Sequence, residues 1–168
     1  MSAVVGIVGW KNSGKTTLII KLVLEFTARG YSVSTIKHAH HHADIDHPGT
    51  DSYRHRQAGA NEVVLVTAER WALMHEVRET AEPSVHEVLA RLAPVDLVIV
   101  EGFKQDPIPK IEVRRCQTAE RKPLADDPHV IAVASDTPTG INGLFLNLDD
   151  VGAIADFIAA YFNLRIPR

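Results

Sequence analysis

The sequence predicts an α/β fold in which helices flank a mostly parallel β-sheet. Short apolar runs alternate along the 168 residues with segments that keep helical spacing. Several of these runs are apolar at consecutive positions, as strands buried on both faces are. Strands of that kind, alternating with amphipathic helices, are typical of a parallel sheet covered by helices. We therefore expect one α/β domain that spans residues 1–168.

The first elements form a strand, a helix and a second strand. Ala3–Gly9 is a β-branched run that ends in glycine, which predicts a buried strand. Apolar residues then recur at helical spacing over Lys15–Arg29, and Gly30 is a typical helix stop. Tyr31–Lys37 is expected to be the next strand. The histidine-rich stretch that follows contains the turn sequence HPGTD, so we expect a loop with a short helix near its end.

A hairpin is expected after position 60. Glu62–Val66 and Arg70–Val77 can pair through the three residues between them. The predicted hairpin is apolar on both faces, and an uncovered hairpin of this kind is a template for pairing with another chain. Either the chain's own helices or a second chain must cover it. We favour the second chain, so residues 62–77 are expected to pair in a homodimer.

The remaining elements continue the alternation of helices and strands. Ser84, with Glu87 three residues later, has the pattern of a capping box and predicts a helix whose apolar stripe extends to Leu92. Asp96–Gly102 is a continuous apolar strand. The last strands and the last helix are expected at Lys110–Arg114, His129–Ser135, Leu144–Leu148 and Asp150–Phe162.

The composition narrows the classes of function. A formal net charge of −3 provides no global basic field, so nothing in it points to nucleic acid or anionic lipid. The single cysteine, Cys116, excludes an internal disulfide and any four-cysteine zinc site, and it suits a reducing compartment. No apolar run approaches the length of a membrane span, and the N-terminus lacks the pattern of a signal peptide. We therefore expect a cytoplasmic protein.

One motif carries the chemistry. GWKNSGKT, at Gly9–Thr16, has the form G-x-x-x-x-G-K-T between a predicted strand and a predicted helix, which is the context that a phosphate-binding loop (P-loop) requires. Glycines let the backbone wrap around an anion, and the amide N–H groups and the helix N-terminus attract negative charge. Lys15 can reach the β- and γ-phosphates, and Thr16 can offer its hydroxyl to Mg²⁺. The sequence therefore predicts a P-loop protein that binds a nucleoside triphosphate.

Two further strands end in carboxylates at the same predicted edge. Glu101 ends the strand DLVIVEG and could hold Mg²⁺ or its water, as a Walker-B acid does; the alternative is an ordinary surface glutamate. Asp136 follows AVAS and could accept hydrogen bonds from guanine, which adenine cannot match. The usual guanine-reading sequence has a lysine two residues earlier, where Ala134 stands here. Guanine is favoured over adenine on this ground alone.

The histidine-rich stretch also begins at this edge, because ligands of open α/β sheets bind beyond the carboxyl ends of the strands. In an extended chain His38, His40 and His42 would share one face. Three interpretations stay open. The stretch could be a transition-metal site, a solvated loop, or a switch segment that meets the nucleotide, its Mg²⁺ or an anionic substrate. Arg54 and Arg56 favour the switch segment, since guanidinium groups suit phosphate oxygens; the alternative is that both form ion pairs on a helix surface.

Together these segments resemble a known family. GWKNSGKTTL, IKHAHHHADIDHPGTDSYRHRQAGA, LVIVEGFK and PKIEV occur in the order and at the spacing of the molybdopterin-guanine dinucleotide biosynthesis adaptor family (MobB). The resemblance implies a GTP-binding protein with weak GTPase activity. Such a protein assists the guanylyltransferase that joins GMP to molybdopterin, and molybdopterin itself is a candidate ligand. The resemblance also implies a homodimer that shares strands.

The resemblance further implies which residues form the sites. The triphosphate would be held by Gly9, Lys11, Asn12, Ser13, Gly14, Lys15, Thr16 and Thr17. Thr16 and Glu101 would form the Mg²⁺ site, and Lys15 and Glu101 would be the catalytic pair. The second signature of the family, a substrate or switch segment, is matched by His38, His40, His41, Asp44, Asp46, Asp51 and Arg54.

Other classes of function stay open. A GTP-dependent metallochaperone of the nickel type would also combine a P-loop with histidines, although the only thiol is far along the chain. A small-metabolite kinase would need an acceptor pocket, with DSYRHR as a candidate lid. A nucleotide-gated binding module would hydrolyse nucleotide only incidentally. Lys104 and Lys110 could contact an anionic substrate or could simply be solvated.

Overall fold

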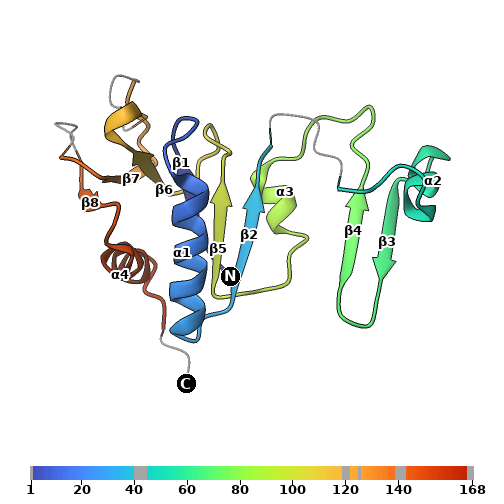
Figure 1. Cartoon of the computed structure of the whole chain (residues 1–168), viewed down its shortest axis with the longest axis horizontal. Helices are drawn as coiled ribbons and strands as arrows, with labels where there is room; N and C mark the ends of the chain where they lie inside the picture. The colour runs from blue at the N-terminus through green and yellow to red at the C-terminus, as the bar shows by residue number, and fades with distance from the viewer. Residues whose placement is uncertain (1, 40–44, 119–121, 125, 139–142, 166–168) are drawn as a thin grey trace. The chain divides into compact units, whose positions relative to one another are not determined.

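The computed structural model describes residues 2–39, 45–118, 122–124, 126–138 and 143–165 (Figure 1). The chain divides into two compact units. Unit 1 comprises Met1–His38 and Val88–Arg168, and unit 2 comprises Ala39–Glu87. The P-loop motif and both strand-end carboxylates belong to unit 1, whereas most of the histidine-rich stretch belongs to unit 2.

Unit 1 is built on a six-stranded sheet in the order β2-β5-β1-β6-β7-β8. Every neighbouring pair of strands is parallel, which confirms the predicted sheet. The strands are β1 (Ala3–Val8), β2 (Val33–Lys37), β5 (Leu97–Glu101), β6 (Lys110–Arg114), β7 (Val130–Ser135) and β8 (Phe145–Asn147). β1 lies between β5 and β6, so the loop that follows β1 has a neighbouring strand end on each side.

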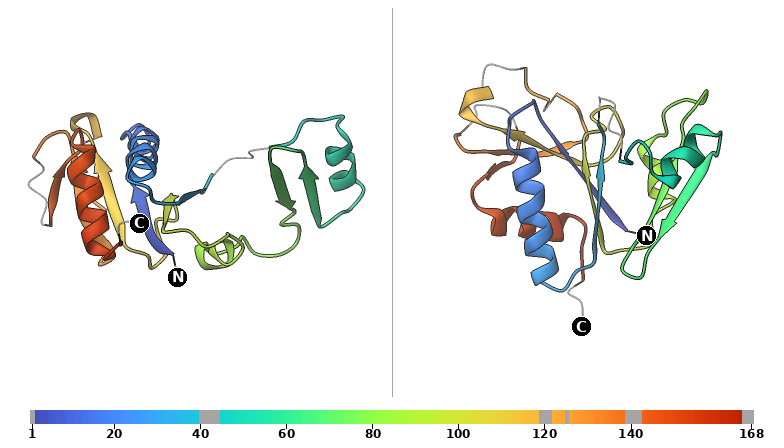
Figure 2. Two further views of the ribbon diagram at one scale, coloured as in Figure 1. Left: turned by 90° about the horizontal axis from the view of Figure 1, so that it is seen from below. Right: turned by 45° about the vertical axis from the view of Figure 1, so that its right-hand side comes forward.

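Two helices, α1 (Lys15–Ala28) and α4 (Val151–Tyr161), pack side by side in unit 1 (Figures 1 and 2). They share one buried apolar cluster with alternate residues of the central strands, and each large apolar side chain in it contributes about 1.5–3 kcal/mol. Asp150 caps α4, because its carboxylate accepts a hydrogen bond from the N–H of Ala153. The cluster includes Val5, Ile7, Leu22, Phe26, Ile99, Ile111, Val113, Ala134, Ile154 and Ile158.

The other face of β6 carries buried charges. Lys110, Glu112 and Arg114 are at most 3% exposed. Lys110 Nζ lies 2.5 Å from the carboxylate of Asp127, and Glu112 lies 2.8 Å from Arg114 and also accepts from the N–H of Leu124. Such pairing is required because an uncompensated buried charge costs several kcal/mol. The suggestion that Lys110 contacts an anionic substrate is therefore wrong: it is buried at the beginning of β6, away from the P-loop edge.

Unit 2 contains the predicted hairpin, formed by antiparallel β3 (Glu62–Val66) and β4 (Trp71–His75). A short helix, α2 (Asp51–Gln57), contacts β3. Val63 and Met74 pair across one face of the hairpin and are 8% and 7% exposed. The other face is exposed and mostly apolar, with Val64 opposite Leu73 and Val66 opposite Trp71.

The helix α3 (Val85–Leu89) begins with the predicted capping box. The N–H and hydroxyl of Ser84 donate to the carboxylate of Glu87 at 2.8 Å, and the N–H of Glu87 donates back to Ser84 Oγ. The helix is shorter than predicted, because the chain leaves it after Leu89 in tight turns instead of continuing to Leu92. The proline at position 94 disfavours helical conformation in the residue before it.

None of the helices in the described part of the chain has the length and apolar character needed to cross a bilayer. A short 3₁₀ helix, Cys116–Thr118, follows β6.

Candidate functional site

The P-loop motif forms the turn from β1 into α1. Gly9 has φ 151°, and a Cβ there would collide with the carbonyl oxygen of Val113, so only glycine fits. Gly14 is the N-cap of α1 with φ 95°. The first turn contains Lys15 and Thr16 but no acidic residue, and within the described residues no side chain caps the helix. The first N–H groups of a helix have no partner inside it, so this terminus is suited to an anion.

Lys15 lies half-buried at the start of α1. Its Nζ donates a hydrogen bond to the carbonyl oxygen of Trp10 at 2.7 Å. Burial lowers the pKa of Lys15, and the nearby Lys104 and Lys37 lower it further, while Glu101 opposes the shift. The ammonium groups of Lys15, Lys104 and Lys37 thus lie near one carboxylate, that of Glu101. A bound polyanion would relieve their mutual repulsion.

Glu101 ends β5, next to β1, and faces the start of α1. Its Oε1 accepts a hydrogen bond from Thr16 Oγ1 at 3.1 Å, and its Oε2 lies 3.8 Å from Lys37 Nζ. Lys37 and Glu101 are paired in the register of β2 and β5, which places both side chains on one face. The structure therefore brings together the predicted hydroxyl and carboxylate. Both are hard oxygen groups of the kind that Mg²⁺ prefers.

His38 is tied to the same strand end. Its N–H donates to the carbonyl oxygen of Glu101 at 2.8 Å, and its ring stacks on Phe103 with the ring centres 4.4 Å apart. Gly102 has φ 99°, and a Cβ there would lie 2.8 Å from the Cβ of His38. The prediction that the histidine-rich stretch begins at this edge of the sheet is confirmed for His38.

Trp10 connects the tip of the loop to its surroundings. Its indole N–H donates to the carbonyl oxygen of Lys122 at 3.0 Å. Lys104 Nζ lies 4.8 Å from the centre of the indole ring, in the geometry of a cation–π interaction. The loop therefore holds Lys104, which the sequence suggested for an anionic substrate, beside the residues that precede Lys15.

Reasoning from the sequence missed Arg115, which follows β6. Its Nε lies 3.0 Å from the position that a Cβ on Gly14 would take. Its Nη1 lies 3.6 Å from Oδ2 of Asp136, whose Oδ1 accepts a hydrogen bond from the N–H of Cys116. Both oxygens of the predicted guanine-reading residue thus have contacts within the chain. Arg115 lies near Gly14 because β6 is next to β1 in the sheet. The order of the strands along the sequence does not predict that they are neighbours.

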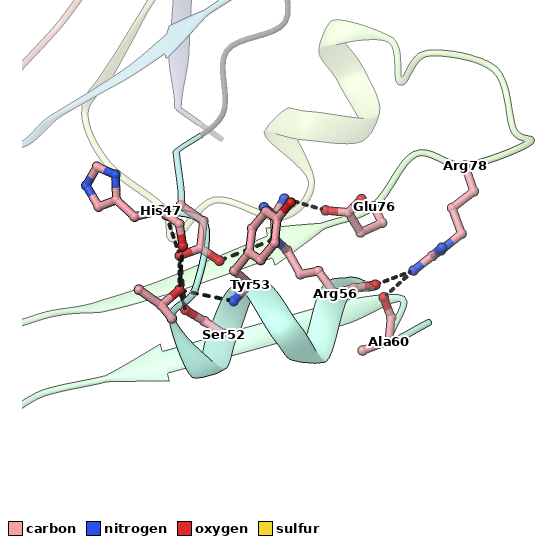
Figure 3. Close-up of polar contacts among 9 residues, drawn as sticks. His47, Ser52, Tyr53, Arg56, Ala60, Glu76 and Arg78 are labelled. Atoms are coloured by element: carbon pink, nitrogen blue, oxygen red, sulfur yellow. Dashed lines mark hydrogen bonds and ion pairs between the residues drawn. The ribbon is translucent and has the colours of Figure 1, made fainter. Parts of the chain in front are cut away.

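Asp46, in unit 2, organises the turn before α2 (Figure 3). Its Oδ1 accepts hydrogen bonds from the N–H of His47 and from the hydroxyls of Thr50 and Ser52, at 2.9–3.0 Å. Its Oδ2 lies 3.4 Å from Nε of Arg56. Burial raises the pKa of Asp46, but the hydrogen bonds outweigh it and the net shift is downward. Asp46 is therefore an ionised anchor of this turn.

Other contacts fix the end of α2 (Figure 3). Arg56 Nη1 donates to the carboxylate of Glu76 at 2.8 Å, and Arg78 donates to the carbonyl oxygens of Arg56 and Ala60. Two other residues of the predicted substrate or switch segment, Asp51 and Arg54, lie on the surface. Their side chains are 91% and 72% exposed and 3.9 Å apart, which is the geometry of a weak surface ion pair.

Three predicted residues, His40, His41 and Asp44, lie outside the described residues, as does His42. Among the residues that the structure does describe, no group of three histidine, cysteine, aspartate or glutamate side chains is placed to hold a metal ion.

A groove of about 710 Å³ lies at the far end of α1, against α4. It is lined by Arg29, Tyr31, Asp156, Ala159, Ala160, Asn163 and Leu164. None of the predicted site residues belongs to it. The candidate site is therefore the loop edge of the sheet and not this groove.

The site and the sheet define a class of protein. A parallel sheet, a glycine-bounded loop between β1 and α1, a lysine at the start of α1 and an acidic residue at the end of the adjacent strand are the parts of the P-loop nucleoside triphosphatase fold. Within this class, a sequence model of the family MobB, molybdopterin guanine dinucleotide synthesis protein B, matches residues 4–136. The chain belongs to the MobB family.

Known proteins are similar to this chain over most of its length. The molybdopterin-guanine dinucleotide biosynthesis adapter protein of Haemophilus influenzae is 45% identical over 162 residues, which cover 94% of this chain and 88% of that protein. The protein of the same description from Escherichia coli is 41% identical over 157 residues, or 92% and 90% of the two chains. The crystal structure of a MobB homolog from Bacillus stearothermophilus matches with a TM-score of 0.70 at 27% identity, over 96% and 99% of the chains.

Proposed function

We propose that this chain is a GTP-binding adapter in the biosynthesis of molybdopterin guanine dinucleotide, with slow, Mg²⁺-dependent GTPase activity. The contact between Thr16 Oγ1 and Glu101 carries the proposal, because it joins a hydroxyl and a carboxylate beside an uncapped helix N-terminus and Lys15. Membership of the MobB family supports the pathway and the choice of guanine.

Each part of the loop has a role in this proposal. The amides of residues 9–17 cradle the phosphates, and Lys15 exchanges its bond to Trp10 for the β- and γ-phosphates. Thr16 and Glu101 hold Mg²⁺, which would neutralise charge on the β- and γ-phosphates. Lys37, whose Nζ lies 3.8 Å from Oε2 of Glu101, is a further cation for the γ-phosphate in this proposal.

The segment from His38 onward is the proposed substrate or switch segment. His38 contacts both the backbone of Glu101 and the ring of Phe103, so a change in the position of Glu101 would reach the start of this segment directly. The guanylyltransferase that joins GMP to molybdopterin is the proposed partner, with molybdopterin as a candidate ligand of the segment.

The hairpin supports a homodimer. Val64, Leu65, Val66 and Trp71 are 55%, 51%, 70% and 68% exposed. Unit 2 buries few apolar side chains of its own among the described residues, chiefly Val63, Met74 and Val85. Exposed, apolar paired strands tend to associate with another chain. We therefore assign residues 62–77 to pairing with a second copy.

The proposal is tested by calorimetric titration of the purified protein with a non-hydrolysable GTP analogue and with the matching ATP analogue. Both titrations contain Mg²⁺ and no transition metal. We expect binding of the GTP analogue, weaker binding of the ATP analogue, and loss of both in Lys15→Ala. Equal binding of ATP would favour a kinase. Binding only after addition of Ni²⁺ or Zn²⁺ would favour a metallochaperone.

The adapter role needs a second assay. Purified guanylyltransferase, molybdopterin and GTP are combined with wild-type protein or with Lys15→Ala, and the dinucleotide is measured. We expect the wild type to raise the yield and the variant to do so less. An equal gain with both proteins would mean that the adapter role does not depend on nucleotide.

A further inference from the structure

The P-loop has a charged side chain on each side. In the sheet, Ile7 of β1 is paired with Glu101 of β5 on one side and with Ile111 of β6 on the other. Side chains alternate between the two faces along a strand, and Ile111 and Val113 of β6 belong to the apolar cluster that includes side chains of α1. Arg115 follows the end of β6, and its guanidinium lies near Gly14. Glu101 and Arg115 thus flank the loop from neighbouring strands.

The guanidinium of Arg115 lies against the last glycine of the loop. Its Nε, Nη2 and Cζ lie 3.0, 3.3 and 3.6 Å from the position that a Cβ on Gly14 would take. The side chain is 34% exposed, so it is partly covered and still reachable from solvent. Gly14 is also the N-cap of α1, so the guanidinium lies at the N-terminus of that helix.

Arg115 and Lys15 place two cationic side chains at the N-terminus of α1, and Asp136 is one partner of the Arg115 guanidinium. A helix N-terminus carries partial positive charge and is stabilised by negative groups. The first turn of α1 instead contains Lys15 and has no acidic residue. The loop also holds a buried polar group, because Ser13 is 0% exposed and its Oγ, which lies beside Gly9, has no hydrogen-bond partner within the described part of the chain. The geometry is therefore that of an anion site.

The carboxylate of Asp136 lies beside the guanidinium of Arg115. Its Oδ2 lies 3.6 Å from Arg115 Nη1, and its Oδ1 accepts a hydrogen bond from the N–H of Cys116 at 2.9 Å. The carboxylate is thus fixed by the backbone that follows β6 and attracts the guanidinium of the preceding residue. This gives Asp136 a role that does not involve the base.

We infer that Arg115 binds the α- and β-phosphates of the nucleotide and that Asp136 positions it. The inference rests on the proposed function, because it requires a nucleotide on the loop. The backbone amides of a P-loop cradle the α- and β-phosphates, whereas the lysine reaches the β- and γ-phosphates. Arg115, beside Gly14, therefore acts on the part that GDP and GTP share. Guanidinium groups suit this task because two of their N–H groups can contact one phosphate.

The test compares Arg115→Gln with Arg165→Gln, which removes the same charge from an exposed arginine after α4. Calorimetry with GDP and with a GTP analogue gives the affinities, and thermal unfolding checks the fold. We expect Arg115→Gln to lower the affinity for both ligands by a similar factor, about 10- to 100-fold, as expected for the loss of a charge-assisted hydrogen bond. Arg115→Lys should recover part of the loss. Arg165→Gln should bind as the wild type does.

The role of Asp136 is tested with Asp136→Asn and the double variant with Arg115→Gln. We expect Asp136→Asn to weaken the binding of GDP and to produce no gain in the binding of xanthosine diphosphate. In the Arg115→Gln background it should cause no further loss of GDP affinity. A gain in xanthosine diphosphate binding would make Asp136 a base reader and overturn its positioning role.

Other outcomes also decide the inference. If the wild type binds nucleotide but Arg115→Gln and Arg115→Lys bind equally well, the inference is wrong and the proposed function stands. A loss confined to the GTP analogue would place Arg115 at the γ-phosphate and overturn the assignment. If the wild type binds neither ligand, the proposed function itself fails.

Discussion

The hydroxyl of Thr16 donates a hydrogen bond to Glu101 across 3.1 Å, which joins the start of α1 to the end of β5. The same carboxylate lies 3.8 Å from the ammonium group of Lys37 at the end of β2. The carboxylate of Glu101 thus contacts both the hydroxyl of Thr16 in α1 and the ammonium group of Lys37 in β2. Under the proposed function, Thr16 and Glu101 would hold Mg²⁺ at this place, and the charge of Glu101 is then the feature to test.

The first prediction concerns Glu101→Gln. The substitution keeps the shape and removes the charge that would hold Mg²⁺, so the gain in nucleotide affinity on adding Mg²⁺ should fall by about tenfold or more. The measurement is the affinity for a GTP analogue with Mg²⁺ and with EDTA. Glu69→Gln, at a glutamate that is 82% exposed, is the control and should keep the wild-type response. An unchanged response in Glu101→Gln would remove Glu101 from the metal site.

The second prediction concerns acid stability. Burial raises the pKa of Asp127, but its hydrogen bonds with Lys110 and His129 prevail and lower the pKa from 3.8 to about 2. Because the folded pKa is depressed, the stabilisation is complete above about pH 4 and is lost as the pH falls toward 2. A shift of this size corresponds to about 2 kcal/mol.

Asp127→Asn should therefore lower the free energy of unfolding at neutral pH by about 3–5 kcal/mol, since it also leaves the buried Lys110 without its anion. The difference from the wild type should narrow as the pH falls from 4 toward 2. Denaturant unfolding across this range measures it. Asp126→Asn, at the exposed neighbouring position, should change little at any pH. A difference independent of pH would contradict the assigned cause.

The sequence predicted correctly those features that a few neighbouring residues specify. The loop between β1 and α1, the capping box of Ser84 with Glu87, and the carboxylate at the end of β5 are each specified within a few neighbouring residues, and all are present. Arg115 was missed because its meaning depends on β6 lying beside β1, and strand order is set by packing between distant segments. Lys110 was misjudged for the same reason: lysine is rarely buried, and only the tertiary structure supplies Asp127.

The third prediction concerns Gly102→Ala. Gly102 has φ 99°, and a Cβ there would lie 2.8 Å from the Cβ of His38, so alanine brings both backbone strain and a clash. Gly59→Ala is a matched control, because Gly59 has φ 111° but nothing within 4 Å of the added Cβ. Gly59→Ala should cost about 1–3 kcal/mol of stability from strain alone.

Gly102→Ala should cost more than this control, and it should also weaken Mg²⁺-dependent nucleotide binding, because His38 is hydrogen-bonded to the backbone of Glu101. Thermal unfolding and the titrations with and without Mg²⁺ give both quantities. If the two alanine variants lose equal stability and nucleotide binding is unchanged, the contact between Gly102 and His38 does not constrain the site.

The last prediction concerns the hairpin. Val66 and Trp71 are opposite each other and are 70% and 68% exposed, so a lysine at either position costs an isolated chain little. If the hairpin pairs with a second copy, Val66→Lys or Trp71→Lys buries a charge in an apolar interface and should shift the protein toward monomer by at least tenfold in dissociation constant. Ala68→Lys, in the turn of the same hairpin, adds the same charge outside the paired strands and should leave the association unchanged. Sedimentation equilibrium measures the association, and a wild type that stays monomeric at all concentrations would contradict the pairing.

A lysine substitution that weakens the dimer without changing the nucleotide affinity would show that the P-loop of each chain binds nucleotide independently of the second chain.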